Sequence, residues 1–151
     1  MRDYIFHGKR IDTDEWVEGY LGYNKTRKQY YIMDDVNSFP VAVHRESVGQ
    51  WTGICDINQR KIFENDIVRT QPFTDRPYSS RAKSKQHIGV VEYCTPELHG
   101  DYCKQKIYDA KWRVKVQDYD KYVCSNWSDF FDCEVIGNVF DNKDLLDGEY
   151  D

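Results

Sequence analysis

The chain alternates between short apolar runs and polar clusters rich in turn-forming residues. The clearest pattern is "IYDAKWRVKVQ", residues 107–117, where every second side chain from Tyr108 to Val116 is apolar or aromatic. Side chains of a β-strand point alternately to opposite faces, so this two-residue period predicts a half-buried strand. The charged residues between them are expected to face solvent.

Shorter apolar runs predict further strands along most of the chain. The opening "YIFHGKRIDTDEWVEGYL" predicts two strands joined by the polar turn "DTDE", with Gly19 and Gly22 indicating a bulge or a close backbone contact in the second. Other candidate strands are "KQYYIM", "FPVAVH", "HIGVVEY" and "CEVIGNVF". Twelve Tyr, seven Phe and four Trp fit this assignment, because aromatic rings pack well on a pleated sheet. We predict a mainly β protein with little helix, whose tail "DNKDLLDGEYD" holds one short helical turn.

The stretch "VGQWTGICDINQRKIFENDIV", residues 48–68, contains two β-rich pieces and a polar turn. A turn that reverses into a strand often needs a residue with positive φ, and Asn tolerates the left-handed region. Asn65 is therefore predicted to adopt it, with Asp66 fixing the turn by a bond to nearby backbone. A catalytic acid is the alternative role for Asp66.

Charge is unevenly distributed over the 151 residues, whose formal net charge is −5. Such a chain is a poor general binder of nucleic acid, because that affinity comes largely from neutralising phosphates. The segment 71–86, "QPFTDRPYSSRAKSKQ", is the basic exception and is predicted to be a long loop. It is either a solvated loop or a capture loop for an anionic partner. The candidate contacts are Arg76, Tyr78, Arg81, Lys83 and Lys85.

Candidate catalytic or metal-binding residues are few. The five cysteines include no C-x-x-C pair, and reduced packing residues are expected of them. Cys94, His99 and Cys103 are the nearest approach to a ligand cluster, but zinc ligands normally come in closely spaced pairs. No Gly-rich phosphate loop or serine nucleophile motif is present. We expect neither a metal nor a cofactor, and no enzymatic activity.

No apolar run reaches the length that spans a membrane, and none follows "MRDYIFHGKR". The protein is therefore expected in the cytosol of the cell that makes it, with no membrane partner.

Three blocks together resemble the YopX family of phage and prophage proteins. They are "FHGKRIDTDEWVEGY", "SVGQWTGICDINQRKIFENDIV" and "CEVIGNVFDNKDLL". The resemblance implies a phage or prophage origin, and hence the cytoplasm of an infected or lysogenic host cell. It also implies a β-rich fold whose C-terminal part is an SH3-like β-barrel. We therefore predict an N-terminal β-hairpin or meander region, residues 1–53, packed on that barrel, residues 54–151. Homo-oligomerisation is implied as well.

The chain departs from the family pattern at several turns. Asn65 replaces the usual Gly, which supports a left-handed turn, and Arg60 replaces the other turn glycine, which predicts a wider hairpin. Lys143 replaces a Pro before the last helical turn, and the loop at 71–86 is an insertion. The family brings no catalytic residues to transfer.

Three classes of function remain open. The first is a non-enzymatic accessory protein that binds a host or phage protein. The second is a counter-defence or regulatory module that binds a nucleotide or nucleic acid, by stacking on Tyr78, Tyr93 or Trp112 beside the cations of the basic loop. The third is an enzyme centred on Cys94, His99 and Cys103.

Self-association is also predicted. Many short strands leave edges that one small subunit covers with difficulty, and identical chains usually pair such surfaces with closed symmetry. Aromatic residues are concentrated in the N-terminal part, where they could serve as interface anchors. They are Trp16, Tyr20, Tyr30 and Tyr31.

Overall fold

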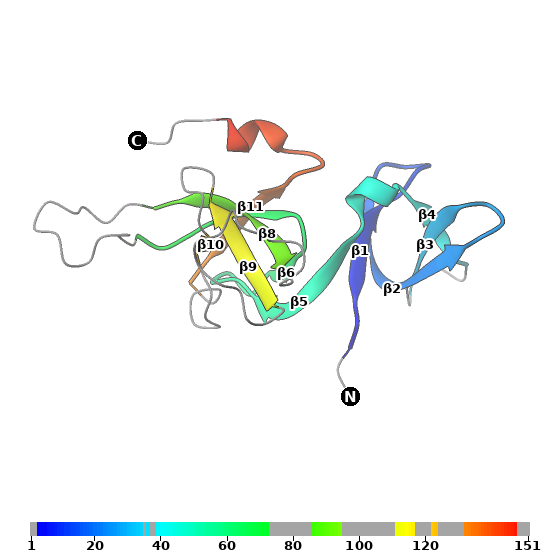
Figure 1. Cartoon of the computed structure of the whole chain (residues 1–151). Coiled ribbons are helices and arrows are strands. Elements are labelled where there is room, and N and C mark those ends of the chain that lie inside the picture. The colour runs from blue at the N-terminus through cyan, green and yellow to red at the C-terminus, as the bar shows by residue number, and fades with distance from the viewer. Residues whose placement is uncertain are drawn as a thin grey trace, which may run out of the picture. The chain divides into compact units, whose positions relative to one another are not determined.

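The computed structural model consists of strands joined by turns and two short 3-10 helices, and it divides into two compact units. Residues 1–53 form the first unit and residues 54–151 the second (Figure 1). The structure describes residues 3–34, 36, 39–72, 86–94, 111–116, 122–123 and 132–147.

The strands follow one another along the chain with short connections. The first unit contains β1 (Phe6–Lys9), β2 (Trp16–Asn24), β3 (Gln29–Met33), β4 (Val41–Val43), η1 (Arg45–Ser47) and the start of β5 (Gly49–Cys55). The second contains the end of β5, β6 (Lys61–Phe63), β7 (Asp66–Arg69), β8 (Ile88–Cys94), β9 (Lys111–Val116), β10 (Tyr122–Val123), β11 (Glu134–Asn138) and η2 (Lys143–Leu146). The predicted mainly β fold with little helix is confirmed.

The first sheet has the strand order β4-β3-β2-β1-β5-β6. β2 is long because it has two successive antiparallel partners: residues 16–19 pair with β1, and residues 20–24 pair with β3. Gly19 lies where the partner changes, and a Cβ atom there would collide with the carbonyl oxygen of Met33. The glycine therefore permits the close backbone contact that the sequence predicts at this strand.

A small apolar core lies on one face of β3 and β4. Ile32 and Val43 are fully buried, and a Cβ on Gly8 of β1 would come within 3.1 Å of the Val43 side chain. The chain that follows β1 reaches β4 through an isolated bridge between Arg10 and Val43. β4 is thus bonded to β3 and to the end of the β1 segment, which holds the core closed around Ile32 and Val43.

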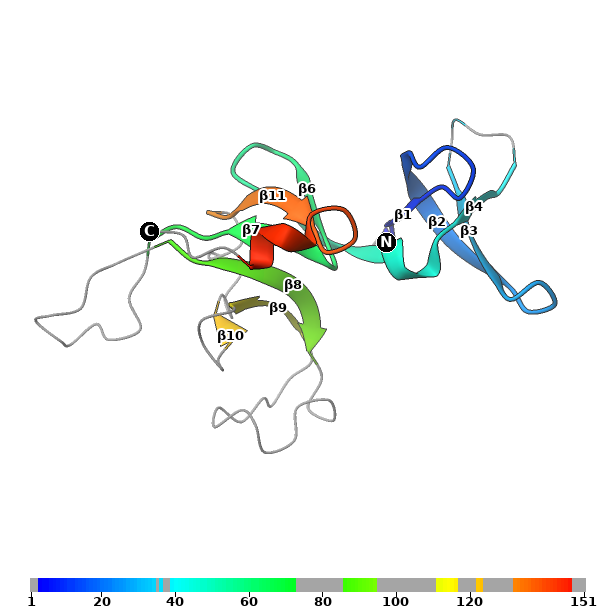
Figure 2. The ribbon, with the colours of Figure 1, turned by 90° about the horizontal axis from the view of Figure 1, so that it is seen from above.

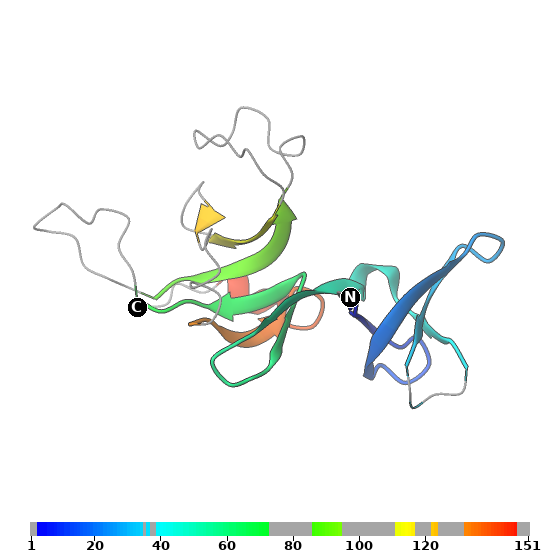
Figure 3. The same ribbon diagram turned by 90° about the horizontal axis from the view of Figure 1, so that it is seen from below.

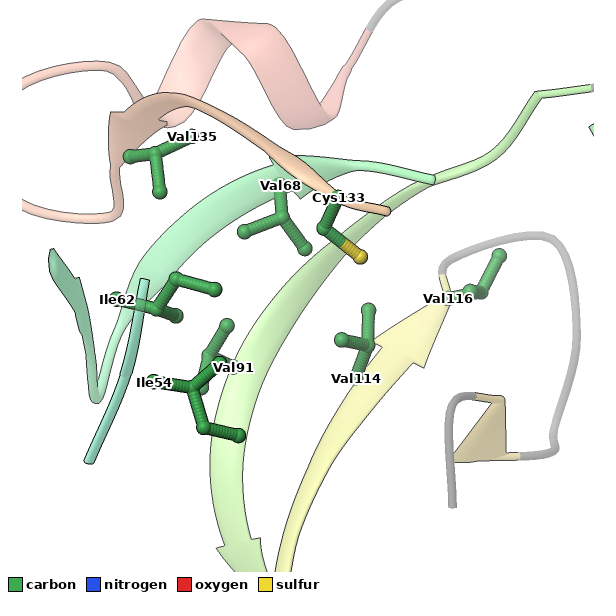
Figure 4. Packing of buried hydrophobic residues seen from close by; sticks show 8 residues of the cluster. All are labelled: Ile54, Ile62, Val68, Val91, Val114, Val116, Cys133 and Val135. Atoms are coloured by element: carbon green, nitrogen blue, oxygen red, sulfur yellow. The ribbon is translucent and has the colours of Figure 1, made fainter. Parts of the chain in front are cut away.

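The second sheet has the order β10-β9-β8-β7-β11, with all neighbours antiparallel. Figure 3 shows β7, β8 and β9 side by side, and η2 lies on one side of this sheet (Figure 2). Its apolar core contains eight buried residues, shown in Figure 4, with Trp112 packed against them. They are Ile54, Ile62, Val68, Val91, Val114, Val116, Cys133 and Val135.

The SH3-like barrel that the resemblance implies is not observed, because neither sheet closes within the part of the chain that the structure describes. The outer edge of β11 is bonded instead by the turn after β5. The N–H of Val135 donates to Oδ2 of Asp56 at 3.0 Å, and the N–H of Ile57 donates to the carbonyl oxygen of Cys133 at 3.0 Å. A turn therefore occupies the hydrogen-bonding positions that a closing strand would need.

The strand predicted from two-residue alternation is observed as β9, with one difference. Val114 and Val116 lie in the core as expected, but Arg113 on the opposite face is 6% exposed. The prediction that this charged face is wholly solvated was therefore wrong at Arg113. The remaining residues of the predicted strand, 107–110 and 117, lie outside the described residues.

Candidate functional site

Exposed aromatic and methionine side chains lie on one face of β2 and β3. Tyr20 stands directly opposite Met33, and their exposed fractions are 54% and 45%. Gly22 stands opposite Tyr31 on the same face, since side chains two residues apart in a strand share a face. Gly22 has no side chain, and the methyl carbon of Met33 lies next to it, 3.7 Å from where a Cβ would stand.

Trp16 lies on the same face of β2, beside β1, and the exposed Glu18 lies between it and Tyr20. Its ring lies 4.6 Å from the ring of His7, centroid to centroid, at an interplanar angle of 42°. His7 is buried and Trp16 is half-buried, so Trp16 partly covers the histidine and leaves its own outer surface accessible. We call the surface formed by Trp16, Tyr20, Tyr31 and Met33 the Tyr20 face.

The four candidate interface anchors do not all share one surface. Alternation along the strands places Trp16, Tyr20 and Tyr31 on the Tyr20 face and Tyr30 on the opposite face. Tyr30 packs instead against its cross-strand partner Tyr23, with ring centroids 4.7 Å apart.

Two buried carboxylates hold turns in the second unit. Asp56 accepts the backbone N–H groups of Asn58 and Arg60, each at 2.8 Å, in addition to that of Val135. Asp66 is 4% exposed and accepts the N–H of Phe63 at 2.8 Å. The N–H groups of Val135 and Phe63 are buried, and the two carboxylates supply the acceptors that such buried donors need.

Burial raises the pKa of Asp66 to about 7. The hydrogen bond from the Phe63 N–H opposes this rise, as does the positive charge of Arg60, whereas the negative charge of Asp56 adds to it. Desolvation outweighs the hydrogen bond because it penalises the charged form directly. Asp66 thus fixes a turn while burial holds its pKa well above the usual range of a carboxyl group.

The turn between β6 and β7 has a left-handed residue at its centre. Asn65 has a φ of 68°, its N–H donates to the carbonyl oxygen of Val91 at 2.8 Å, and its own carbonyl accepts the N–H of Val139 at 3.0 Å. These bonds tie the turn to β8 and to the end of β11.

A second aromatic pair lies on the second sheet. Tyr93 of β8 stands opposite Trp112 of β9, and their rings make an edge-on contact with centroids 5.0 Å apart. Tyr93 is exposed, whereas Trp112 is half-buried against the core. The third candidate stacking residue, Tyr78, lies outside the described residues.

Several predicted site residues cannot be placed. Arg76, Arg81, Lys83, Lys85, His99 and Cys103 lie outside the described residues. Cys94 is fully buried at the end of β8. Among the residues that the structure describes, no three His, Cys, Asp or Glu side chains gather as a metal site would require, and no helix is long and apolar enough to cross a membrane.

Comparison with known protein families assigns the chain to one of them. The sequence profile described as YopX protein matches residues 6–147, nearly the whole chain. The chain belongs to the YopX family. Membership of this family suggests a phage-type protein. No curated protein matches the chain.

In this YopX-family chain, sequence reasoning missed two members of the aromatic surfaces. Met33 was not a candidate, although it is the cross-strand partner of Tyr20, and Tyr23 was not a candidate, although it contacts Tyr30. The register of the β2–β3 hairpin identifies both. The sequence does offer a signal for this register. If Asn24 is paired with Gln29 across the turn at residues 25–28, counting along both strands pairs Tyr23 with Tyr30 and Tyr20 with Met33.

Proposed function

We propose that this YopX-family chain is a non-enzymatic phage accessory protein that assembles with itself through the Tyr20 face and binds a host or phage protein. The observation that carries the proposal is the exposed pair of Tyr20 and Met33, placed opposite one another on adjacent strands. Aromatic and methionine side chains are enriched where protein interfaces are fully buried.

The Tyr20 face has the composition of a contact surface. Single exposed apolar residues are common on monomers and need no explanation. Here four large side chains, at Trp16, Tyr20, Tyr31 and Met33, share one face of β2 and β3, on which Glu18 is an exposed charge between Trp16 and Tyr20. Removing apolar surface from water is favourable by roughly 25 cal/mol per Å², so covering this face with a second copy would stabilise an assembly. A self-complementary contact of this kind usually closes with twofold symmetry.

The test is the mass in solution of the full chain. Sedimentation should give a multiple of the 18.0 kDa monomer for the wild-type protein. The double variant Tyr20→Ser/Met33→Ser should sediment as a monomer with an unchanged far-ultraviolet circular dichroism spectrum. The matched control is Tyr4→Ser/Ile11→Ser, which removes an exposed aromatic and an exposed aliphatic residue elsewhere in the first unit. A monomeric wild-type protein at micromolar concentration would refute the self-association.

The partner requires a separate experiment. Tagged wild-type protein should retain a specific phage or host protein from the cytoplasm of infected or lysogenic cells, and the purified pair should then bind directly. Turnover of a small molecule by the purified chain would instead point to an enzyme. An SH3-like arrangement of the second unit stays a prediction.

A second candidate function is binding of a nucleotide or nucleic acid through the second unit. The contact between Tyr93 and Trp112 favours it, because an exposed ring held by a neighbouring ring can stack on a base. Cations of the 71–86 loop would supply the phosphate contacts. Retention on a heparin column that falls between two salt concentrations and disappears on deletion of residues 73–85 would support this function.

A further inference from the structure

The turn between β2 and β3 carries a concentration of positive charge in an acidic chain. Lys25, Arg27 and Lys28 lie in it, and no Asp or Glu occurs from Tyr20 to Met33, although the whole chain has a formal net charge of −5. In all three views the turn projects away from the rest of the first unit (Figures 1, 2 and 3).

Local hydrogen bonds give this turn a defined conformation. Oδ1 of Asn24 accepts the N–H of Arg27 at 3.0 Å, and Lys28 adopts a left-handed φ of 52°. At the base of the turn, Nε2 of Gln29 donates to the carbonyl oxygens of Tyr30 at 3.0 Å and Val43 at 2.8 Å. The cations are therefore carried on a turn whose backbone is fixed and whose base is tied to β4, which limits the ordering that a ligand would have to impose.

An accessible aromatic ring lies near the end of β2, two residues before Lys25. Tyr23 is 50% exposed, and its ring is held by contact with Tyr30 at a centroid distance of 4.7 Å. The side chains of Lys25, Arg27 and Lys28 are exposed, and within the described part of the chain they make no ion pair. Their charges thus remain available to an anionic ligand.

We propose that the β2–β3 turn binds single-stranded nucleic acid, with a base stacked on Tyr23 and phosphates contacted by Lys25, Arg27 and Lys28. Cations supply affinity for the phosphate backbone, and aromatic rings supply a stacking surface for any base. A duplex fits less well because its bases are already stacked and paired. An acidic peptide would use the cations but would leave the exposed ring without a flat partner.

This site is separate from the surface of the proposed assembly. Alternation along β2 directs Tyr20 and Tyr23 to opposite faces of the strand, so a second copy on the Tyr20 face would not cover Tyr23. The site also differs from the Tyr93–Trp112 pair and the 71–86 loop. Failure of either proposal therefore leaves the other in place.

The test is fluorescence anisotropy with the full chain and labelled dT and rU oligomers of about 15 nucleotides, a length that covers typical single-strand sites. Binding to either oligomer that persists when residues 73–85 are deleted supports the proposal, and the stronger of the two identifies DNA or RNA. The logarithm of the binding constant should fall with the logarithm of salt concentration with a slope of about −2, as about three phosphate contacts on a single strand predict.

Variants then locate the site. K25Q/R27Q/K28Q should weaken binding at least tenfold, and Tyr23→Ser should weaken it about 5- to 100-fold, the effect of losing one base–aromatic stack. Tyr23→Phe should retain binding because it keeps the ring. The matched controls are R45Q/K115Q/K143Q, which changes net charge equally at exposed positions, and Tyr4→Ser, which removes an exposed ring elsewhere in the first unit. Ultraviolet cross-linking of a 5-iodouracil oligomer should modify Tyr23.

Three results would overturn the proposal. One is the absence of binding to both oligomers at about 100 μM protein and 50 mM salt, conditions in which phosphate contacts are strong. Another is a loss of oligomer affinity in the control variants as large as that in the turn variants. The third combines two observations: polyglutamate at matched charge concentration displaces the oligomer, and Tyr23→Ser leaves the affinity for the oligomer unchanged. Together they would assign the turn to binding of an acidic protein.

Discussion

Asn65 tests how strongly one backbone conformation shapes the turn before β7. Its φ of 68° suits Gly and Asn but strains a β-branched residue. Asn65→Gly should leave the free energy of unfolding unchanged or raise it slightly, whereas Asn65→Val should lower it by about 1–2 kcal/mol. Urea denaturation measures both. Equal stability of the two variants would show that the turn does not depend on this conformation.

Ionisation of Asp66 should lower the free energy of unfolding as pH rises. Burial raises the pKa of Asp66 from 3.8 to about 7, so the folded state holds the proton more tightly than the unfolded state. This contribution is complete below the unfolded pKa and is lost as pH rises through the folded pKa. Between pH 5 and pH 8 the loss should be about 2–3 kcal/mol. Denaturation at the two pH values measures it.

Asp66→Asn provides the matched comparison. The amide is the uncharged counterpart of a protonated carboxyl group, and its oxygen can still accept the N–H of Phe63. The variant should therefore be more stable than the wild type at pH 8 and should show a flatter pH dependence. Asp144→Asn, at an exposed position, should change neither. If the wild type and Asp66→Asn lose the same stability between the two pH values, Asp66 is not the titrating group.

The turn could be predicted from the residue types at positions 65 and 66. Few residues other than Gly tolerate a left-handed φ, and Asn is one of them. The environment of Asp66 could not be inferred in the same way. Its pKa depends on burial and on Asp56, whose carboxylate is fixed by the N–H of Val135, 79 positions along the chain. Contacts across such a separation leave no local pattern in the sequence.

β2 offers a comparison between two glycines on one strand. A Cβ at Gly19 would collide with the Met33 carbonyl, whereas a Cβ at Gly22 would have its nearest neighbour at 3.7 Å, the Met33 methyl carbon. Gly19→Ala should therefore lower the free energy of unfolding by about 2–3 kcal/mol, and Gly22→Ala by less than about 1 kcal/mol. Thermal and urea unfolding of the pair would measure the difference. Similar costs would mean that β2 and β3 separate easily at this point.

The positions of the strands could be predicted more readily than the burial and pairing of their side chains. The alternation around Trp112, Val114 and Val116 identifies β9 because the pattern is local and repeated. The burial of Arg113 on the same strand was not predicted. It depends on contacts with other parts of the chain, and the alternation within one strand carries no information on those contacts. The pairing of Tyr20 with Met33 follows from the register of the β2–β3 hairpin, which the pattern alone does not determine.

For the whole molecule, self-association should make thermal stability depend on protein concentration. An assembly that forms only from folded chains is stabilised by mass action, so the Tm of the wild-type protein should rise as its concentration increases. The Tyr20→Ser/Met33→Ser variant should have a Tm independent of concentration. Differential scanning fluorimetry over a hundredfold concentration range would measure both. A constant wild-type Tm over that range would contradict the assembly.

Family and fold class could be predicted for the whole chain, whereas closure of the second sheet could not. The recurring blocks, which span residues 6–146, specify turns and core strands and predicted the YopX family, whose profile matches residues 6–147. Whether a sheet closes depends on its two edge strands meeting. At β11 that edge is bonded by Asp56 and Ile57, and no pattern in the sequence indicates this contact.

β5 has a consequence for any attempt to divide the protein. Residues 49 and 50 pair with β1, the strand then crosses the boundary between the units at Gly53, whose φ is 89°, and β6 is its other neighbour. Domain boundaries usually fall in exposed linkers that can be cut without loss. Here a cut before β5 would leave β1 paired with β2 alone, and a cut after β5 would separate β6 from it. Either cut would expose a strand edge that is paired in the whole chain. Unpaired strand edges bind other chains and promote aggregation.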